Sequence, residues 1–266
     1  MTLSWIVNGI HEAQQSIELQ VFLRVQLQVV DLAIQTNVRI KRAFLTVMPD
    51  SQHFFEGRAE YLSVVHVQQI AQTLVRDGVI GLYDFRADVV RAFVAAGWVY
   101  DGECVIWKNP QSQSIRTRAK GLAFQQLEKD SSWLRPAMAD YILLFRAPGV
   151  NPRPIECDVS RDEWIQFASP IWLDILESDT LNYEVAREND DERHICPLQL
   201  ETVRRCMRLW SNPGDVILSP FMGIGTEGHI AMEQGRRFVG IELKESYFNQ
   251  SEKNIRAAVK QESLFV

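Results

Sequence analysis

A glycine-rich turn between two apolar runs constrains the fold of this chain more than any other feature of the sequence. Residues 215–219 (DVILS) form a short apolar run that suits a strand buried on both faces. Residues 221–225 (FMGIG) make the turn, and residues 226–234 have the pattern of the helix that it opens. A second apolar run, residues 237–241 (RFVGI), ends at Glu242. This order of strand, turn, helix, strand and acid predicts a right-handed βαβ unit of a doubly wound α/β fold.

Further helices and strands are predicted on the N-terminal and C-terminal sides of this unit. Apolar residues at helical spacing predict helices over residues 84–96, 197–210 and 245–259. Extended apolar runs predict strands over residues 62–67, 98–107 and 140–145. Asp84 is expected to cap the first of these helices and Gly97 to end it. Trp164 and Trp172 are expected in the core.

The first sixty residues are the least regular part of the sequence. Residues 17–29 alternate apolar and polar side chains almost without interruption, which predicts a strand, although an unusually long one. The only proline in this part of the chain is Pro49. We therefore interpret residues 1–60 as a degenerate or atypical N-terminal segment and residues 61–266 as the main domain.

The composition is that of a globular protein. The 266 residues are 46% hydrophobic and 23% charged, which excludes a disordered chain. No apolar run is long enough to cross a bilayer, and the N-terminus lacks the pattern of a signal peptide, so a cytoplasmic protein is expected. The four cysteines are widely spaced and form no CxxC pair. They predict buried thiols and no metal site.

The net charge of −6 means that a nucleic-acid partner has to bind a local basic surface. One stretch offers such a surface, because residues 104–127 include four basic residues and no acidic one. Together with two nearby side chains, these residues are the candidate DNA-binding set: Lys108, Arg116, Arg118, Lys120, Trp133 and Arg135. The alternative is a solvated helix face without a ligand.

The glycine turn and Glu242 suit a ligand that carries a ribose. Glycines let a ligand approach the backbone, and the helix N-terminus offers unpaired N–H groups. Glu242 follows Gly225 by 17 residues, at the end of the next strand, where a carboxylate can accept both ribose hydroxyls. Phe221 and Met222 are too bulky for a phosphate cradle, and the Lys-Ser/Thr of a P-loop is missing. These features favour S-adenosylmethionine, which has a ribose and no pyrophosphate.

Two alternatives to this cofactor stay open at this point. The glycines can serve only to make a tight turn, with Glu242 as a cap of the last helix. A dinucleotide-dependent oxidoreductase also has a glycine turn followed by an acid. The bulky pair before Gly223 argues against the dinucleotide.

Residues 215–228 (DVILSPFMGIGTEG) closely resemble a motif of a known family, the DNA methyltransferases that modify exocyclic amines of adenine or cytosine. The motif of that family is DxVLDPFxGxGT. Residues 193–200 (RHICPLQL) resemble the family's preceding segment, which lies against the methionine end of the cofactor, and residues 235–243 (GRRFVGIEL) continue the match. Other segments look like bacteriophage and prophage members: residues 65–69, 77–86, 107–110, 129–133 and 139–146. The resemblance covers roughly residues 62–260.

The resemblance implies a Rossmann-like fold with circularly permuted motif order, because the cofactor motif lies near the C-terminus. It implies transfer of a methyl group from S-adenosylmethionine to N6 of adenine or N4 of cytosine in double-stranded DNA, after the target base has left the stack. It further implies a DNA-facing insert at residues 108–192, a cofactor-binding βαβ unit at residues 193–260, and a bacterial host cell in which such enzymes serve restriction–modification. The implied cofactor-binding residues are Ile195, Cys196, Pro197, Leu198, Ser219, Pro220, Phe221, Gly223, Gly225, Thr226, Glu242 and Leu243.

The family's catalytic motif, Asp/Ser/Asn-Pro-Pro-aromatic, is expected before residue 60 and is absent there. The nearest similar segment, residues 169–172 (SPIW), lacks the second proline, and Ser169 is interpreted as structural or substrate-lining. The sequence therefore assigns no catalytic residue. The alternative function is a non-catalytic DNA- or protein-binding remnant that keeps the cofactor fold.

Overall fold

The computed structural model describes residues 4–7, 44–48, 62–68, 73–76, 79–82, 84–149, 154–156, 159–182, 184–186 and 197–262. Its strands are β1 (Ser4–Val7), β2 (Phe44–Met48), β3 (Leu62–Gln68), β4 (Thr73–Arg76), β5 (Val79–Leu82), β6 (Val99–Ile106), β7 (Asp140–Arg146), β8 (Ile171–Trp172), β9 (Val216–Ser219) and β10 (Arg237–Glu242). Its α-helices are α2 (Phe85–Ala95), α3 (Pro110–Thr117), α4 (Phe124–Lys129), α5 (Arg161–Phe167), α6 (Leu200–Trp210), α7 (Thr226–Glu233) and α8 (Glu245–Glu262). Short 3-10 helices are η3 (Lys120–Leu122), η4 (Ser131–Trp133) and η5 (Glu184–Ala186).

The structure confirms the predicted strands and helices from residue 62 onward. Asp84 caps α2 as expected, since its carboxylate accepts a hydrogen bond from the Ala87 N–H at 3.1 Å. Gly97, with φ +92°, follows the end of that helix. The predicted strand over residues 17–29 lies outside the described residues.

Two predictions about the helices differ from the structure. The helix predicted from residue 197 begins at Leu200, because Gln199 is extended and forms a β-bridge with Thr180. Trp172 is buried in the core at 1% exposure, but Trp164 is 55% exposed, so its predicted core position is wrong. Trp164 belongs to α5, a helix of only seven residues, and so short a pattern does not define an inner face.

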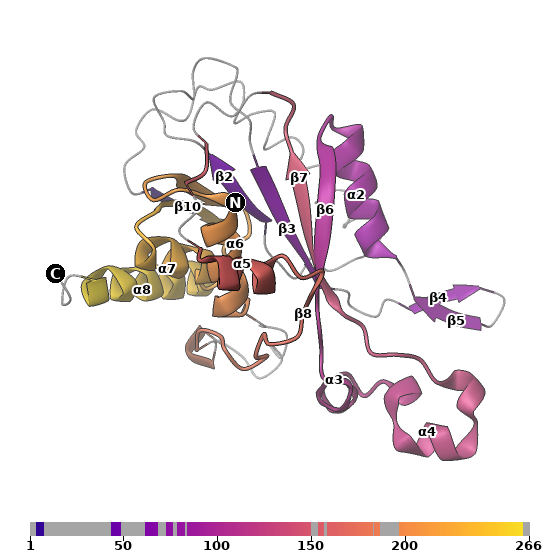
Figure 1. Cartoon of the computed structure of the whole chain (residues 1–266). Coiled ribbons are helices and arrows are strands. Elements are labelled where there is room, and N and C mark those ends of the chain that lie inside the picture. Colours follow the sequence, from indigo (N-terminus) through magenta and orange to yellow (C-terminus); the bar gives the residue numbers. More distant parts are fainter. Residues whose placement is uncertain are drawn as a thin grey trace.

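Eight of the described strands form one mixed sheet in the order β1-β10-β9-β2-β3-β7-β6-β8, and β4 pairs with β5 separately. β9 and β10 are parallel, as predicted for the βαβ unit. The pair β6–β8 is also parallel, whereas the remaining neighbours in this sheet are antiparallel. Figure 1 shows α2 beside β6 at one side of the sheet and α6, α7 and α8 together at the other side.

Helices cover both faces of the sheet because successive strand residues point to opposite faces. Val64 on β3 packs in a cluster with residues of α6, α7 and α8, and the next residue, Val65, packs in a second cluster with Phe93 of α2. Ile142 and Leu143 on β7 divide between the same two clusters. The described part is therefore a three-layer, Rossmann-like α/β structure. None of its described helices has the length and apolar character needed to cross a bilayer.

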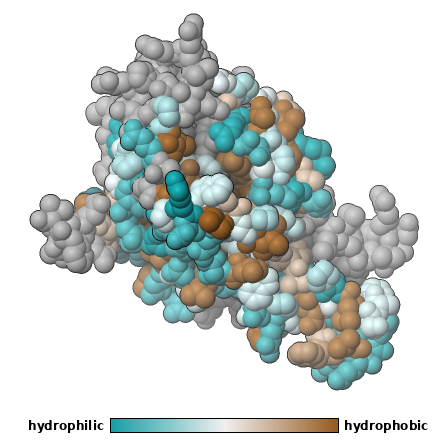
Figure 2. All heavy atoms as spheres, in the orientation of Figure 1, coloured by the Kyte–Doolittle hydropathy of each residue, from teal (hydrophilic) through white to brown (hydrophobic). Residues whose placement is uncertain are grey.

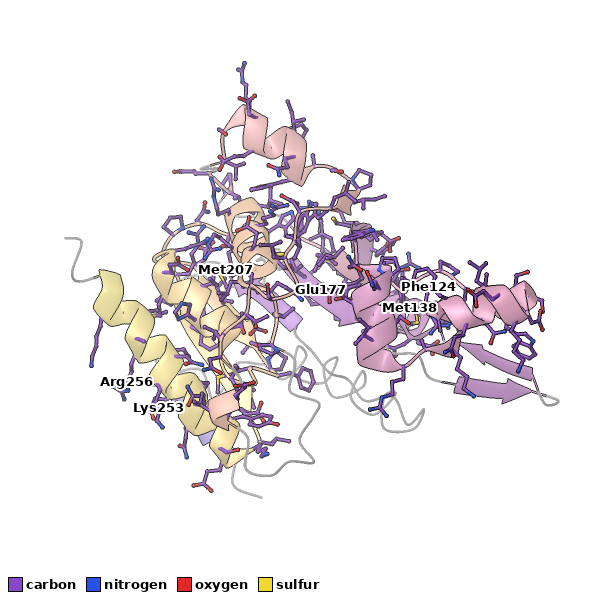
Figure 3. The ribbon with its side chains drawn as sticks, turned by 90° about the horizontal axis from the view of Figure 1, so that it is seen from below. Phe124, Met138, Glu177, Met207, Lys253 and Arg256 are labelled. Atoms are coloured by element: carbon purple, nitrogen blue, oxygen red, sulfur yellow. The ribbon has the colours of Figure 1, made fainter. Side chains whose placement is uncertain are left out.

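A lobe made of α3, η3, α4 and η4 projects beyond one end of the sheet in Figure 1; we call residues 110–133 the α3–η4 lobe. Gln113 attaches the lobe, since its side chain donates to the Met138 carbonyl and accepts from the Met138 N–H, each at 2.8 Å. Glu177 adds a bond at the start of α3, where its carboxylate accepts from the Asn109 N–H at 3.2 Å (Figure 3). The lobe is thus fixed at its base by contacts with distant parts of the chain.

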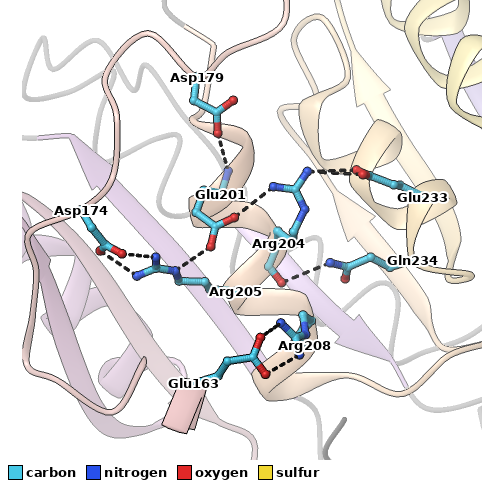
Figure 4. A network of polar contacts seen from close by, with 9 residues as sticks. All are labelled: Glu163, Asp174, Asp179, Glu201, Arg204, Arg205, Arg208, Glu233 and Gln234. Atoms are coloured by element: carbon cyan, nitrogen blue, oxygen red, sulfur yellow. Dashed lines mark hydrogen bonds and ion pairs between the residues drawn. The ribbon is translucent and has the colours of Figure 1, made fainter. Parts of the chain in front are cut away.

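Arginines of α6 hold α5 and the segment after β8 against that helix (Figure 4). The Arg205 guanidinium pairs with Asp174 at 2.5 Å and with Glu201 at 2.8 Å. One turn further on, Arg208 pairs with Glu163 of α5 at 2.9 Å. The side chain of Arg205 is 5% exposed, so its ion pairs are shielded from water more than those of Arg208, which is 22% exposed.

The pairing of Glu163 predicts a specific loss of stability in acid. Hydrogen bonds from Arg208, followed by those from Ser160, lower the pKa of Glu163 from 4.5 to about 2. Between these two values the unfolded chain binds a proton that the folded chain does not, so the free energy of unfolding falls as the pH falls. Glu163→Gln is expected to make this acid-side slope shallower by about one proton in denaturant titrations.

Arg208→Met serves as the matched variant, because it removes the other partner of the same pair. We expect Arg208→Met to flatten the slope in part, because hydrogen bonds from Ser160 still lower the pKa of Glu163. The double variant should match Glu163→Gln alone, which removes the titrating group. An acid-side slope that stays the same in Glu163→Gln would contradict the assignment.

Candidate cofactor site

The two glycines of the turn after β9 have different roles. Gly223 has φ +56°, and a Cβ built on it meets no atom of the described residues within 4 Å. Gly225 has φ +85°, and a Cβ there would lie 2.8 Å from the Cβ of Ser251 on α8. Both need glycine for their left-handed backbone. Gly225 also lets α8 approach the turn, whereas Gly223 leaves open space in front of the backbone.

These glycines predict a difference between two matched substitutions. Gly225→Ala adds overpacking against Ser251 to the strain of a left-handed backbone. Gly235→Ala carries the strain alone, because Gly235 has φ +68° and a Cβ there meets no atom within 4 Å in the part of the chain that the structure describes. In denaturant titrations Gly225→Ala is expected to lower the free energy of unfolding by about 1–3 kcal/mol more than Gly235→Ala. Equal losses would show that α8 does not pack closely on the turn.

Backbone contacts hold the turn against the end of β10. The Met222 N–H donates to the Ile241 carbonyl at 3.0 Å, and the Gly225 N–H donates to the Met222 carbonyl at 2.8 Å. Met222 is buried, and a side chain at Gly240 would collide with its sulfur. Met222 therefore fills the core beneath the turn and does not line a ligand surface.

Glu242 links the two strands of the βαβ unit at this edge. Its Oε2 accepts a hydrogen bond from the Gly223 N–H at 2.9 Å. Its Oε1 accepts from the N–H groups of Leu243 at 3.0 Å and Lys244 at 2.9 Å, just before α8. The structural role proposed as an alternative for Glu242 is therefore real. Glu242 is only half-buried, and these three bonds leave one of the roughly four acceptor sites of its carboxylate, on Oε2, for a ligand.

Several of the other predicted cofactor residues belong to this turn or to the elements beside it, but few of those described are open to a ligand. Ser219 and Thr226 are buried, and Leu198 lies in the core at 5% exposure. Leu243, in contrast, is 69% exposed beside Glu242. Of the remaining predicted residues, Pro197 is buried, Pro220 and Phe221 are half-buried, and Ile195 and Cys196 lie outside the described residues.

One buried residue at this site was missed by the sequence analysis. Glu227, in the first turn of α7, is 3% exposed, and its Oε1 accepts a hydrogen bond from the Ser219 hydroxyl at 3.2 Å. A signal was present in the sequence. Glu227 precedes Ile230 by three residues and Ala231 by four, so it lies on the apolar face of the helix.

The predicted DNA-binding residues divide into two groups. The prediction that Lys108 binds DNA is wrong. Its side chain is 2% exposed and its Nζ lies 2.7 Å from a carboxylate oxygen of Asp140, so it does not reach a phosphate. Arg118 and Lys120 are exposed on the lobe, Trp133 is 58% exposed, and Arg135 is half-buried. The side chain of Arg116 lies outside the described residues. The exposed members stay a prediction.

Apolar side chains accompany these basic residues on the α3–η4 lobe. Ile115 is 73% exposed, Phe124 76% and Leu127 55%. Figure 2 shows brown, apolar residues among teal ones where this lobe projects. The lobe therefore offers a surface of mixed aromatic, aliphatic and basic character. Basic groups for phosphates and flat side chains for bases are the components of nucleic-acid contacts.

The strand next to β9 bears on the missing catalytic motif. β2 runs antiparallel to β9, with Met48 opposite Val216 and Thr46 opposite Leu218. β9 ends at the glycine turn. Because β2 runs in the opposite direction, its carboxyl end lies at the other end of the strands, away from that turn. The Ser169 hydroxyl donates to the Ile171 carbonyl at 2.8 Å, and its interpretation as structural or substrate-lining stays a prediction. In the described part of the chain, no three His, Cys, Asp or Glu side chains are grouped to hold a metal ion.

The two cysteines that the structure describes are buried thiols, as the sequence predicts. Cys104 and Cys206 are free and buried, and burial raises the pKa of both, that of Cys104 to about 12. Thiols in this state are poor nucleophiles at neutral pH. The other two cysteines, Cys157 and Cys196, lie outside the described residues.

Comparison with known proteins gives similar sequences and folds. The chain is 35% identical over 142 residues to the type II methyltransferase M.BglI of Bacillus subtilis. The matched stretch covers 53% of this chain and 37% of that protein. It is 40% identical over 58 residues to the type II methyltransferase M1.MboII of Moraxella bovis, which covers 22% of each protein. The chain thus matches well under half the length of these relatives.

A similar solved structure comes from Thermus thermophilus. That protein is described as a DNA modification methylase complexed with S-adenosyl-L-methionine; it is 22% identical, with a TM-score of 0.54 over 74% of this chain and 69% of the other. The likeness supports the Rossmann-like methyltransferase fold. A family model, described as DNA methylase, matches residues 68–253, which is more than half of the sequence. The chain therefore belongs to the N6/N4 DNA methylase family.

Proposed function

We propose that the protein transfers a methyl group from S-adenosylmethionine to an exocyclic amine of double-stranded DNA, at N6 of adenine or N4 of cytosine. The observation that carries the proposal is the open space in front of Gly223, directly beside the carboxylate of Glu242. A ribose-bearing ligand without a pyrophosphate fits a turn that offers backbone access and a hydroxyl acceptor together. The family of the chain and the methyltransferases it resembles support this ligand.

Three residues of the site have distinct roles in this proposal. Gly223 admits the cofactor to the backbone, and Glu242 accepts a hydrogen bond from a ribose hydroxyl while it keeps the turn in place. Leu243, which is 69% exposed at the same corner, offers an apolar surface for the adenine ring. When bound, S-adenosylmethionine supplies a methyl group activated by a positively charged sulfur.

DNA is proposed to bind the exposed basic and aromatic residues of the α3–η4 lobe and its C-terminal flank. Arg118 and Lys120 supply positive charge for phosphates, with Trp133 and Arg135 available for stacking. A chain with a net charge of −6 concentrates its attraction for DNA in such a local surface.

The source of the amine-holding group separates two candidate functions. An active enzyme needs a group that holds the target amine, and the Asp/Ser/Asn-Pro-Pro-aromatic motif is absent from residues 1–60. Without such a group the protein would be the second candidate, a remnant that binds the cofactor without methyl transfer. An origin in a phage or prophage, which the sequence resemblance implies, would be compatible with either candidate.

The experiment is transfer of labelled methyl groups to unmodified genomic DNA of mixed sequence, followed by digestion to nucleosides. We expect label in N6-methyladenine or N4-methylcytosine with the parent protein and none with Glu242→Ala. Absence of label from DNA, together with cofactor binding by the parent only, would replace the primary proposal by the second candidate.

A further inference from the structure

The α3–η4 lobe has no hydrophobic interior of its own. Among its described residues, none in η3, α4 or η4 is buried, and the only buried side chain of α3 is that of Gln113. Its large apolar side chains face outward instead, since Ile115, Phe124 and Leu127 are all more than half exposed. Phe124 and Leu127 lie one turn apart on the same side of α4. Apolar surface of this kind is typical of a binding site, because a partner removes it from water.

Contacts across the lobe hold it in one shape despite the missing interior. The Arg135 N–H donates to the Gly121 carbonyl at 3.1 Å, which joins η3 to the segment after η4. The approach is close, because a Cβ built on Gly121 would lie 2.9 Å from the Trp133 carbonyl oxygen. Arg118 turns the chain from α3 toward η3 with φ +53°, the one left-handed backbone of a non-glycine residue in the described part of the chain. The outward apolar side chains are thus carried by a preorganised lobe.

The charge of the lobe favours a polyanion as its partner. Residues 110–135 contain five basic and two acidic residues, a net charge of +3 in a chain whose total is −6. Arg118 and Lys120 are exposed shortly before Phe124 along the chain, and Lys129 is exposed after it. Duplex DNA offers both components that such a surface binds, phosphates for the cations and base stacks for the apolar side chains.

The lobe leaves the sheet at the same end of the strands as the glycine turn. Successive antiparallel pairings of β9 with β2, β2 with β3, β3 with β7 and β7 with β6 make β6 run in the same direction as β9. The glycine turn follows β9 and the lobe follows β6, so both lie at carboxyl ends. Neighbouring strands are about 4.8 Å apart, which separates the two by about 19 Å, the length of about six base pairs. A duplex along this end of the sheet therefore reaches both.

We propose that the lobe inserts Phe124 between stacked bases of duplex DNA, as an apolar wedge at a base step away from the methylated base. Phe124 (labelled in Figure 3) is 76% exposed, more than any other large apolar side chain of the described residues, and its ring is flat. An inserted side chain kinks the duplex and brings more of it against the protein. The inference rests on the proposed function and adds to it a residue that selects DNA by how easily it deforms.

The test is a fluorescence titration of the full chain with two labelled duplexes of the same mixed sequence, one intact and one with a single central abasic site. The wedge has to unstack bases in the intact duplex, whereas it finds a gap in the abasic one. We expect the parent protein to bind the abasic duplex about 10- to 100-fold more tightly. In Phe124→Ala this preference should fall below about twofold, whereas Phe124→Leu, which keeps an apolar wedge, should retain most of it.

Two control variants separate insertion from other effects. Trp164→Ala removes an exposed aromatic side chain from α5, outside the lobe, and should leave both affinities within about twofold of the parent. Lys120→Ala should weaken binding of both duplexes by the same factor, because a phosphate contact does not distinguish them. Neither variant should change the ratio of the two affinities.

A preference for the abasic duplex that persists in Phe124→Ala, or that is missing in a parent protein which binds both duplexes, would overturn the inference and leave the proposed function standing. Loss of a dimer by Phe124→Ala in sedimentation, with an unchanged ratio of affinities, would also overturn it and assign the surface to a second copy of the chain. A parent protein that binds neither duplex would refute the DNA partner of the proposed function as well. The preference does not depend on methyl transfer, so an inactive remnant would still show it.

Discussion

Lys108→Ala is expected to lower the free energy of unfolding by about 3–5 kcal/mol, the range found when one partner of a buried ion pair is removed. The Nζ of Lys108 lies 2.7 Å from Asp140 Oδ2, and the two side chains are 2% and 4% exposed. Alanine would leave the Asp140 carboxylate buried without the Lys108 charge. Urea or guanidinium titration of the folded chain measures the loss directly.

The control for this prediction is Lys120→Ala, a loss of the same charge from an exposed position in the same basic stretch. It should change the free energy of unfolding by less than about 0.5 kcal/mol and should weaken DNA binding at low salt. If Lys108→Ala left stability unchanged and weakened DNA binding as much as Lys120→Ala, the burial of Lys108 would be refuted and its original assignment as a phosphate contact restored.

Glu242→Ala is expected to weaken binding of S-adenosylmethionine about 10- to 150-fold. One ribose hydroxyl would lose a hydrogen bond to a charged acceptor, worth about 1.5–3 kcal/mol. The substitution also frees the Gly223 N–H, which the carboxylate now binds at 2.9 Å, so the turn loses its link to β10. Calorimetric or fluorescence titration of the purified variant gives the change in affinity.

Two variants separate these contributions. Glu242→Gln keeps one acceptor oxygen and should fall between the parent and Glu242→Ala. Glu245→Ala removes an exposed acid three residues further on and should bind like the parent. Equal affinity of Glu242→Ala and the parent would mean that the ribose lies elsewhere and that Glu242 serves only the turn before α8.

The βαβ unit could be predicted from the sequence because its signals are local. The glycine turn, the apolar runs on each side of it and Glu242 lie within about thirty consecutive residues, and each constrains the next. The cap at Asp84 was predictable for the same reason, since it depends on the Ala87 N–H three residues away.

Contacts between distant residues could not be predicted in this way. Asp140 follows Lys108 by 32 residues, and the two meet because the register of β6 and β7 sets Ile106 opposite Asp140. The sequence shows a basic stretch around Lys108 but not the register of the strands. It therefore predicts an exposed Lys108 among the DNA-binding residues. The Ser219–Glu227 contact is shorter in sequence, but its significance depends on burial, which composition does not reveal.

The direction of β2 in the sheet could not be predicted from the sequence. An absent motif could be read directly, since residues 1–60 contain no Pro-Pro pair. The antiparallel pairing of Thr46 with Leu218 could not, because a five-residue apolar strand has no intrinsic direction within a sheet.

The most direct test of the central claim, that the turn between β9 and α7 is a site for S-adenosylmethionine, is a calorimetric titration of the full chain with this cofactor and, in parallel, with NAD⁺. We predict saturable binding of S-adenosylmethionine at one site per chain and no binding of NAD⁺, because no described residue fills the space in front of Gly223, whereas the bulky Phe221 leaves no phosphate cradle. A folded chain that binds NAD⁺ and ignores S-adenosylmethionine would contradict the claim.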